Sequence, residues 1–286
     1  MEDPRFAGPK PPFGVPPRSG DLNPKPDHGE RTYVGCNRLE HYAAIVVGGD
    51  SGIGRAVAIA FAREGASVLI GYQGDREDAE ETVRWISEAG RRAVAVPGDL
   101  RSDAYRQLLV ERSIEEFGSL DVLVSDAPWI NDVEDGLAVE EAIRSGQEAV
   151  FALSLLAAAK MKPGAAIVAT TLAQLEHAPS LQRAYAAYRG GVGSLTASLA
   201  RELSGRGVRV NAVEPGPVWA PRMLAALTDE QVASFGANTL FGRPAQPAEM
   251  APAYVFLASP AASFITGAVL PVTGGQLEPT PAKFAE

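Results

Sequence analysis

Cysteine and histidine are scarce in this sequence. The single cysteine, Cys36, excludes an internal disulfide and a thiolate metal site, and it suits a reducing compartment. The three histidines, His28, His41 and His177, show no ligand spacing, so we expect each to have a surface or packing role. The sequence therefore predicts neither a disulfide scaffold nor a metal site.

Long apolar runs and an excess of basic residues are also missing. No stretch approaches the roughly 18 apolar residues of a membrane span, and the N-terminus lacks the basic and apolar regions of a secretion signal. With 35 acidic against 26 basic residues, the chain carries a formal charge of -9 and has no stripe of lysine and arginine. We expect a cytoplasmic protein that binds neither membrane nor nucleic acid.

The first 40 residues are rich in proline and glycine, which prevent a helix or a central strand. By composition alone this segment is typical of disorder, whereas Phe6, Phe13 and Tyr33 offer side chains that could hold it against a neighbouring surface. We expect residues 1–40 to form an extended arm, called the arm below, and residues 41–286 to form a single domain.

From Tyr42 onward, short apolar runs alternate with longer amphipathic segments. We expect strands at 43–47, 66–70, 93–97, 121–124, 165–169, 208–213 and 269–272, and helices at about 52–64, 78–89, 103–117, 137–160 and 184–204. Apolar strands separated by helices predict a parallel sheet covered on both faces, which right-handed crossovers wind doubly. The expected fold class is α/β, a Rossmann-type doubly wound parallel sheet of about seven strands.

A glycine-rich turn directly follows the first expected strand and reads Gly48-Gly49-Asp50-Ser51-Gly52-Ile53-Gly54. Glycine permits a tight turn, and the helix that begins after it presents backbone N–H groups to an anion such as pyrophosphate. Glycine clusters are often plain loops, but the order strand, turn, helix indicates a dinucleotide site. The predicted cofactor-binding residues here are Gly48, Ser51, Gly52, Ile53 and Gly54.

The spacing Gly48-x-x-x-Gly52-x-Gly54 resembles that of the short-chain dehydrogenase/reductase family. The resemblance covers about 41–276 and is also carried by Asp99-Leu100, Tyr185, the run from Asn211 to Trp219, and the run from Val272 to Gly275. Residues 24–30 resemble the extended N-terminus of a bacterial subgroup of this family. The resemblance implies a bound NAD(P)(H) and a small carbonyl substrate.

The resemblance also implies which residues hold the cofactor. The pair Asp99 and Leu100 marks the adenine contact, and Pro215, Gly216 and Val218 belong to the segment along the nicotinamide amide. Members that prefer NAD place an acid at the end of the second strand, where this chain has Tyr72. A 2′-phosphate could meet Arg55 or Arg76, although both also suit a solvated surface, so the sequence favours NADP weakly.

Members of the family reduce carbonyls with a tyrosine, a lysine, a serine and an asparagine. Tyr185 matches the tyrosine, and Arg189 stands at the lysine position, where it keeps the positive charge without the geometry of an ammonium. Leu172 occupies the serine position and Gly146 the asparagine position. Losing a donor to the substrate oxygen costs roughly two to three orders of magnitude in rate. A neighbouring threonine, Thr170 or Thr171, could replace the serine only if the strand bulges there.

Further departures from the family pattern are Val47, Ala220 and the run from Ser125 to Pro128, which stands in place of Asn-Asn-Ala-Gly. The first hypothesis is therefore a pseudoenzyme that binds NAD(P)(H) with standard hydride transfer weak or lost. The alternatives are an active NADP-dependent reductase of an aldehyde or ketone that uses Tyr185 and Arg189, and an interaction subunit without nucleotide.

The resemblance implies a homo-oligomer, a dimer or tetramer, through the fourth and fifth crossover helices and the last strand. A hetero-oligomer with an active relative is the other form of assembly that the pseudoenzyme hypothesis allows. Residues 219–245, called the lid segment below, would cover the substrate in this fold, and their apolar residues suit simple packing equally well.

Overall fold

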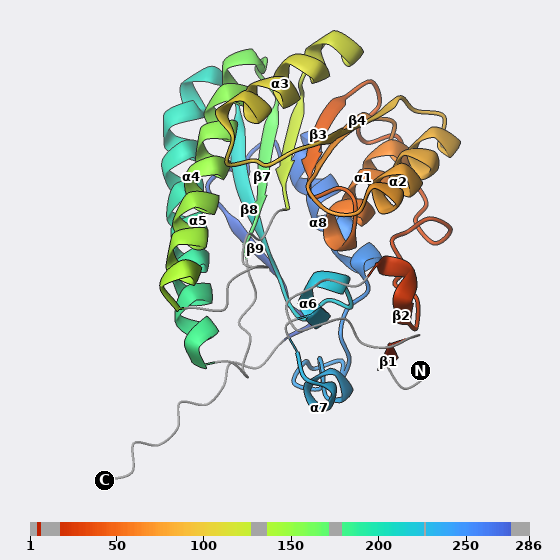
Figure 1. Ribbon diagram of the computed structural model, residues 1–286. Helices are drawn as coiled ribbons and strands as arrows, with labels where there is room; N and C mark the ends of the chain where they lie inside the picture. Colours follow the sequence, from red (N-terminus) through yellow and green to blue (C-terminus); the bar gives the residue numbers. More distant parts are fainter. Residues whose placement is uncertain (1–4, 7–17, 127–135, 172–178, 226, 276–286) are drawn as a thin grey trace.

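The computed structural model describes residues 5–6, 18–126, 136–171, 179–225 and 227–275. Its main sheet has seven parallel strands in the order β5-β4-β3-β6-β7-β8-β9 (Figure 1). The strands are β3 (Ala43–Val47), β4 (Ser67–Tyr72), β5 (Ala93–Pro97), β6 (Val122–Ser125), β7 (Ala166–Thr170), β8 (Arg209–Pro215) and β9 (Val269–Val272). The predicted fold class is confirmed, and every expected strand is present with small differences at its ends.

Helices cover both faces of the sheet. One face carries α1 (Gly52–Arg63), α2 (Arg76–Glu88) and α8 (Pro247–Ala258), and the other carries α3 (Asp103–Phe117), α4 (Gly136–Lys160) and α5 (Pro179–Leu203) (Figure 1). The five expected helices are all present. The sequence pattern did not predict α8, because Pro247 and Pro252 suggest a break, whereas Pro247 lies in the first turn, where proline is tolerated.

The direction in which the chain crosses the sheet changes between β3 and β6. These two strands are neighbours, and the chain winds outward from β3 through β4 to β5, and from β6 through β7 to β9. In open parallel sheets a crevice forms at the carboxyl ends of the strands at this switch point, and ligands bind there. The turn after β3 and the residues after β6 therefore border the expected site.

The described part of the arm lies against both the first crossover unit and the lid segment. Two short strands, β1 (Arg5–Phe6) and β2 (Leu22–Asn23), pair antiparallel in it. Leu22 is buried in an apolar cluster with residues of the lid segment, namely Trp219, Leu224, Leu227 and Val232. The indole Nε1 of Trp219 donates a 2.7 Å hydrogen bond to the carbonyl of Pro24. The arm therefore contributes to the core beside α6 (Pro221–Ala225) and α7 (Asp229–Ala233).

A second anchor of the arm is the carboxylate of Glu64, which is fully buried just after α1. It accepts hydrogen bonds from the Tyr33 hydroxyl at 2.6 Å, from the Arg38 guanidinium, and from the backbone N–H groups of Cys36 and Arg38. Although burial raises the pKa of Glu64, the hydrogen bonds from Arg38 and Tyr33 outweigh it and hold that pKa at about 2. The charge of Glu64 therefore binds the arm to α1.

Candidate functional site

The glycine turn between β3 and α1 has the backbone shape that an anion site needs. Gly48 and Gly52 adopt positive φ angles of 82° and 53°, where other residues are strained. A Cβ at Gly54 would overlap the carbonyl oxygen of Gly48, so the helix approaches the strand more closely than any side chain allows. Ser51 caps α1 in an extended conformation without a side-chain cap bond, and Ile53 lies in its first turn. These residues present the start of α1 to the crevice.

A pocket opens beside this turn, at the carboxyl ends of three neighbouring strands. It is lined by Val47, Gly48, Tyr72, Gln73, Gly98, Leu100, Tyr105 and Arg222. The sequence-predicted residues Gly48 and Leu100 therefore lie around one pocket. Asp99 lies next to Leu100, and its carboxylate accepts hydrogen bonds from Arg101, which hold its pKa below the usual range. Tyr72, which stands where members that prefer NAD have an acid, is the last residue of β4, as expected.

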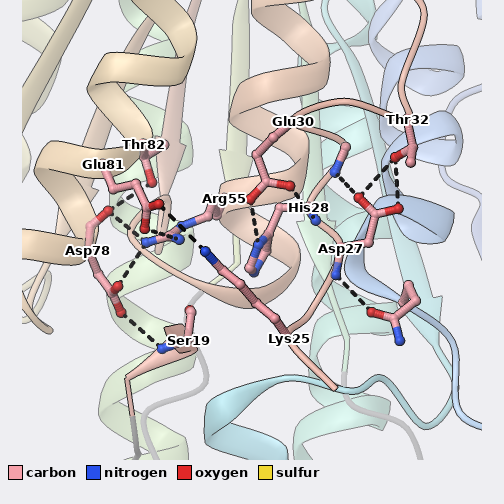
Figure 2. A network of polar contacts seen from close by, with 12 residues as sticks. Ser19, Lys25, Asp27, His28, Glu30, Thr32, Arg55, Asp78, Glu81 and Thr82 are labelled. Carbon is pink, nitrogen blue, oxygen red and sulfur yellow. Dashed lines mark hydrogen bonds and ion pairs between the residues drawn. The ribbon is translucent and has the colours of Figure 1, made fainter. Parts of the chain in front are cut away.

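Arg55 does not line this pocket, and its burial contradicts both roles considered for it, a contact to a 2′-phosphate and a solvated surface position. Its side chain is fully buried and lies within a polar network (Figure 2). There it donates to the carbonyl of Asp50 at 2.9 Å and pairs with Asp78 and Glu81, both at 3.0 Å. Arg76, by contrast, is exposed and pairs with Glu80 on its own helix at 2.7 Å.

The same network ties the arm to α2. The backbone N–H of Ser19 donates to the carboxylate of Asp78, and Lys25 lies 3.8 Å from Glu81 (Figure 2). His28 is fully buried nearby, its Nδ1 is 3.2 Å from Glu30, and burial lowers its pKa. The packing role expected for His28 is therefore confirmed, whereas His41 is exposed and His177 lies outside the described residues.

Two acidic residues that the sequence reasoning did not assign border the crevice. Asp50, inside the glycine turn, is 2% exposed, and burial raises its pKa while the charge of Arg222 opposes that rise. Asp126 directly follows β6, and burial raises its pKa to about 6 although Thr170 donates to it and Arg222 stabilises its charge. The Gly54 N–H also donates to Asp126. The signal for Asp126 was present in the sequence, since an acid replaces an amide there.

The end of β7 shows no bulge as far as the structure describes it. Residues 166–170 pair in unbroken parallel register with β8, and the Thr171 N–H extends the ladder to the carbonyl of Val213. The Thr170 hydroxyl lies 2.7 Å from the Tyr254 hydroxyl of α8. Thr170 therefore faces α8, and the bulge that a substitute for the serine requires is absent from the described end of this strand.

The remaining catalytic positions lie only partly in the described structure. Leu172 is outside the described residues. Tyr185 and Arg189 lie in α5, but their side chains are outside the described part of the chain. Gly146 is buried in α4, and its neighbour Gln147 donates to the carbonyl of Tyr188 at 3.2 Å. The asparagine position thus offers no side chain, and the predicted roles of Tyr185 and Arg189 stay predictions.

The segment after β8 brings the lid segment back to the glycine turn. Pro215 ends β8, and a Cβ at Gly216 would overlap Thr273, so these two stretches lie in close contact. Val218 is buried and pairs with Ala245. The Cβ of Ala220 lies 3.3 Å from where a Cβ of Gly52 would be. Ala220, at the end of this stretch, therefore lies directly against the start of α1.

No group of three His, Cys, Asp or Glu side chains among the described residues is arranged to hold a metal ion. None of the helices in that part of the chain is long and apolar enough to cross a membrane.

Comparison with known proteins places the chain among oxidoreductases. The family model described as enoyl-(acyl carrier protein) reductase matches residues 47–276. The oxidoreductase YghA of Escherichia coli is 40% identical over 263 residues, covering 89% of each chain. NADPH-dependent aldehyde reductase 1 of Arabidopsis thaliana is 34% identical, over 89% of this chain and 92% of its own. A solved short chain dehydrogenase from Burkholderia cenocepacia in complex with NADP superposes with a TM-score of 0.75 at 31% identity, over 84% of this chain and 99% of its own.

Proposed function

Because the chain belongs to the short-chain dehydrogenase/reductase family of oxidoreductases, we propose that it binds NAD(P)(H) in the crevice beside Gly48 and that standard hydride transfer to a carbonyl is weak or lost. The observation that carries the binding is the glycine turn, which brings the first turn of α1 to the switch point of the sheet. When bound, the nicotinamide ring supplies or accepts the hydride.

The described residues fit such a dinucleotide. The absence of a side chain at Gly54 lets α1 pack closely against the backbone of the turn, and the start of α1 favours a negatively charged pyrophosphate. Tyr72, Leu100 and Tyr105 provide apolar and aromatic surface in the pocket, which suits an adenosine. Gly48, Ser51, Gly52, Ile53 and Gly54 hold the pyrophosphate in this proposal, Asp99 and Leu100 the adenine, and Pro215, Gly216 and Val218 the nicotinamide.

The loss of turnover is proposed from the residues at three positions. Leu172 cannot donate to a carbonyl oxygen, Gly146 has no side chain for a proton relay, and Arg189 replaces an ammonium by a planar guanidinium. Thr170 is engaged by Tyr254, so its hydroxyl does not restore the missing donor.

The choice between NAD and NADP is the finer part of the proposal. The names of the Arabidopsis and Burkholderia relatives mention NADPH and NADP, in line with the weak preference for NADP drawn from the sequence. Of the two arginines behind that preference, Arg55 is enclosed in its own network, and Arg76 pairs with Glu80 at the surface. We therefore propose NAD(P)(H) as the cofactor without resting the choice on either arginine.

The first test is isothermal titration of the purified protein with NADPH and with NADH. We expect binding of at least one cofactor at micromolar concentration. A Gly54→Ala variant that stays folded should bind neither, because its Cβ overlaps the Gly48 carbonyl and forces the turn out of its shape. Absence of binding by the wild-type protein would overturn the proposal in favour of an interaction subunit.

The second test measures turnover with a panel of aldehydes and ketones. We expect little or no reduction by the wild-type protein, and the triple variant Leu172→Ser, Gly146→Asn, Arg189→Lys should create activity. The competing proposal, an active reductase that uses Tyr185 and Arg189, is supported by the aldehyde reductase named among the relatives. That proposal is correct if the wild-type protein reduces a substrate and Tyr185→Phe abolishes the activity.

Assembly and location complete the proposal. We propose a cytoplasmic homo-oligomer, dimer or tetramer, since the family assembles through the helices that correspond to α4 and α5 and through the last strand. The side chains of β9 are partly exposed at the sheet edge, with Val269 37% exposed, which leaves surface for a second copy. Light scattering during size exclusion measures the mass, and a monomer at micromolar concentration would contradict this part.

A further inference from the structure

The proposed function does not say which residue at the end of β4 contacts the adenosine ribose. A dinucleotide with a free adenosine ribose is usually held there by a carboxylate that accepts hydrogen bonds from the ribose hydroxyls. This chain has Tyr72 at that position, followed by Gln73 and Gly74. Tyr72 is 9% exposed, belongs to the apolar core and lacks a carboxylate. Any acid that serves the ribose must therefore come from another element.

Asp50 reaches this place from the glycine turn. A Cβ on Gly74 would overlap its Oδ2, so the carboxylate occupies the space that a side chain after β4 would fill. Glycine at position 74 is what allows this approach. Asp50 itself does not line the pocket, but Gly48 of the same turn and Gln73, the neighbour of Gly74, both do. The carboxylate therefore lies next to two segments that border the pocket.

The two carboxylate oxygens of Asp50 have different surroundings. Oδ2 is held against Gly74, whereas Oδ1 is buried and has no hydrogen-bond partner among the described residues. A buried carboxylate oxygen without a donor is unfavourable, and such atoms in native proteins commonly await a ligand or a water. The Oδ1 oxygen of Asp50 is therefore a hydrogen-bond acceptor that has no donor among the described residues.

We propose that Asp50 is the carboxylate that accepts hydrogen bonds from the adenosine ribose hydroxyls of the bound dinucleotide, in place of the acid missing from the end of β4. This inference rests on the proposed cofactor binding. It assigns the ribose contact to the first turn of the fold instead of the second strand. A carboxylate at this position also repels a 2′-phosphate, so this assignment predicts a preference for NADH over NADPH, opposite to the weak preference for NADP drawn from the sequence.

Arg222 of α6 completes the site. Its Nη2 lies 3.7 Å from the Cβ position of Gly74, so the guanidinium and the carboxylate flank the same glycine. Asp50 is 2% exposed, and Arg222 is the described side chain of the lid segment that lines the pocket. The charges of Asp50 and Arg222 therefore lie together beside Gly74, just after the end of β4.

The experiment compares the affinities for NADH and NADPH in the wild-type protein and in Asp50→Asn, by isothermal titration. A hydrogen bond to a charged group contributes enough for about a tenfold change in affinity or more. We expect Asp50→Asn to weaken NADH about tenfold and to leave NADPH unchanged or tighter. Glu115→Gln is the control, because it removes one exposed carboxylate on α3, outside the proposed site, and it should leave both affinities unchanged.

A second measurement needs no variant. An NADH analogue with a 2′-deoxyadenosine should bind the wild-type protein about tenfold more weakly than NADH, and it should bind Asp50→Asn as NADH does. Independent, additive losses from the variant and from the analogue would overturn the assignment, as would an unchanged NADH to NADPH ratio in a folded Asp50→Asn. If the wild-type protein binds neither cofactor, the proposed function itself fails and this inference with it.

Discussion

Replacement of Asp126 by asparagine should make the protein more stable at neutral pH. The carboxylate stands just after β6, where the family commonly has asparagine, and it accepts hydrogen bonds from the Gly54 N–H and the Thr170 hydroxyl. An amide oxygen can accept both bonds without carrying a charge into the crevice. Asp126→Asn therefore keeps the contacts and removes the desolvated charge.

The magnitude follows from the pKa of Asp126, which burial raises from 3.8 to about 6 in the folded protein. Because the folded pKa is the higher one, the neutral acid stabilises the fold below about pH 4, and this contribution is lost as the pH rises through about 6. The difference corresponds to about 3 kcal/mol of unfolding free energy at pH 7 and above. Asp50 raises the pKa of Asp126, while Arg222 lowers it.

The assay is guanidinium unfolding of both proteins at a series of pH values between about 4 and 8. The stability of Asp126→Asn relative to the wild-type protein should be near zero at pH 4, grow between pH 4 and 6, and level off above. Glu115→Gln removes a carboxylate that is 65% exposed and should show no such profile. A difference that is independent of pH, or a variant that is less stable at pH 8, would refute the reasoning.

Three further changes test other parts of the structure. Trp219→Phe removes the donor to the Pro24 carbonyl but keeps an aromatic ring, so the free energy of unfolding in urea should fall by about 1–2 kcal/mol. Proteases should also cut the arm faster, and unchanged cleavage would contradict the role of this bond. Glu64→Gln should lower the free energy of unfolding by about 3 kcal/mol at pH 7. Because the folded pKa of about 2 lies below the usual 4.5, this difference from the wild-type protein should shrink as the pH falls from about 4.5 toward 2, and acid unfolding measures it. Gly54→Ala should destabilise the fold strongly, because its Cβ overlaps the Gly48 carbonyl; a wild-type melting temperature by circular dichroism would disprove the close approach.

The elements of the sheet could be predicted because each apolar run is long enough to be a buried strand and is followed by a helix with its own start signal. The N-caps Asp75 and Ser102 accept hydrogen bonds from the first turns of α2 and α3, and Gly118 ends α3 in the left-handed conformation. These are local interactions, so the sequence near each helix contains them. The glycine turn was predictable for the same reason.

The parts that the sequence did not predict depend on contacts between distant residues. Arg55 follows the turn and resembles a phosphate ligand in sequence, but Asp78 and Glu81 of α2 draw it into the interior. In the sequence Asp50 is an ordinary turn residue, and only the structure shows that its carboxylate occupies the space left by Gly74. Periodicity and spacing contain no information on such pairings, because they arise from the packing of α1, α2 and the lid segment together.

The hydrogen bond from Trp219 to Pro24 joins residues that are 195 positions apart. The backbone of Asp27 likewise bonds to Gln246 and Ala248 near the start of α8. During synthesis the arm leaves the ribosome well before its partners in the lid segment and α8. Leu22 and Pro24 therefore reach these native contacts only after the lid segment has been made.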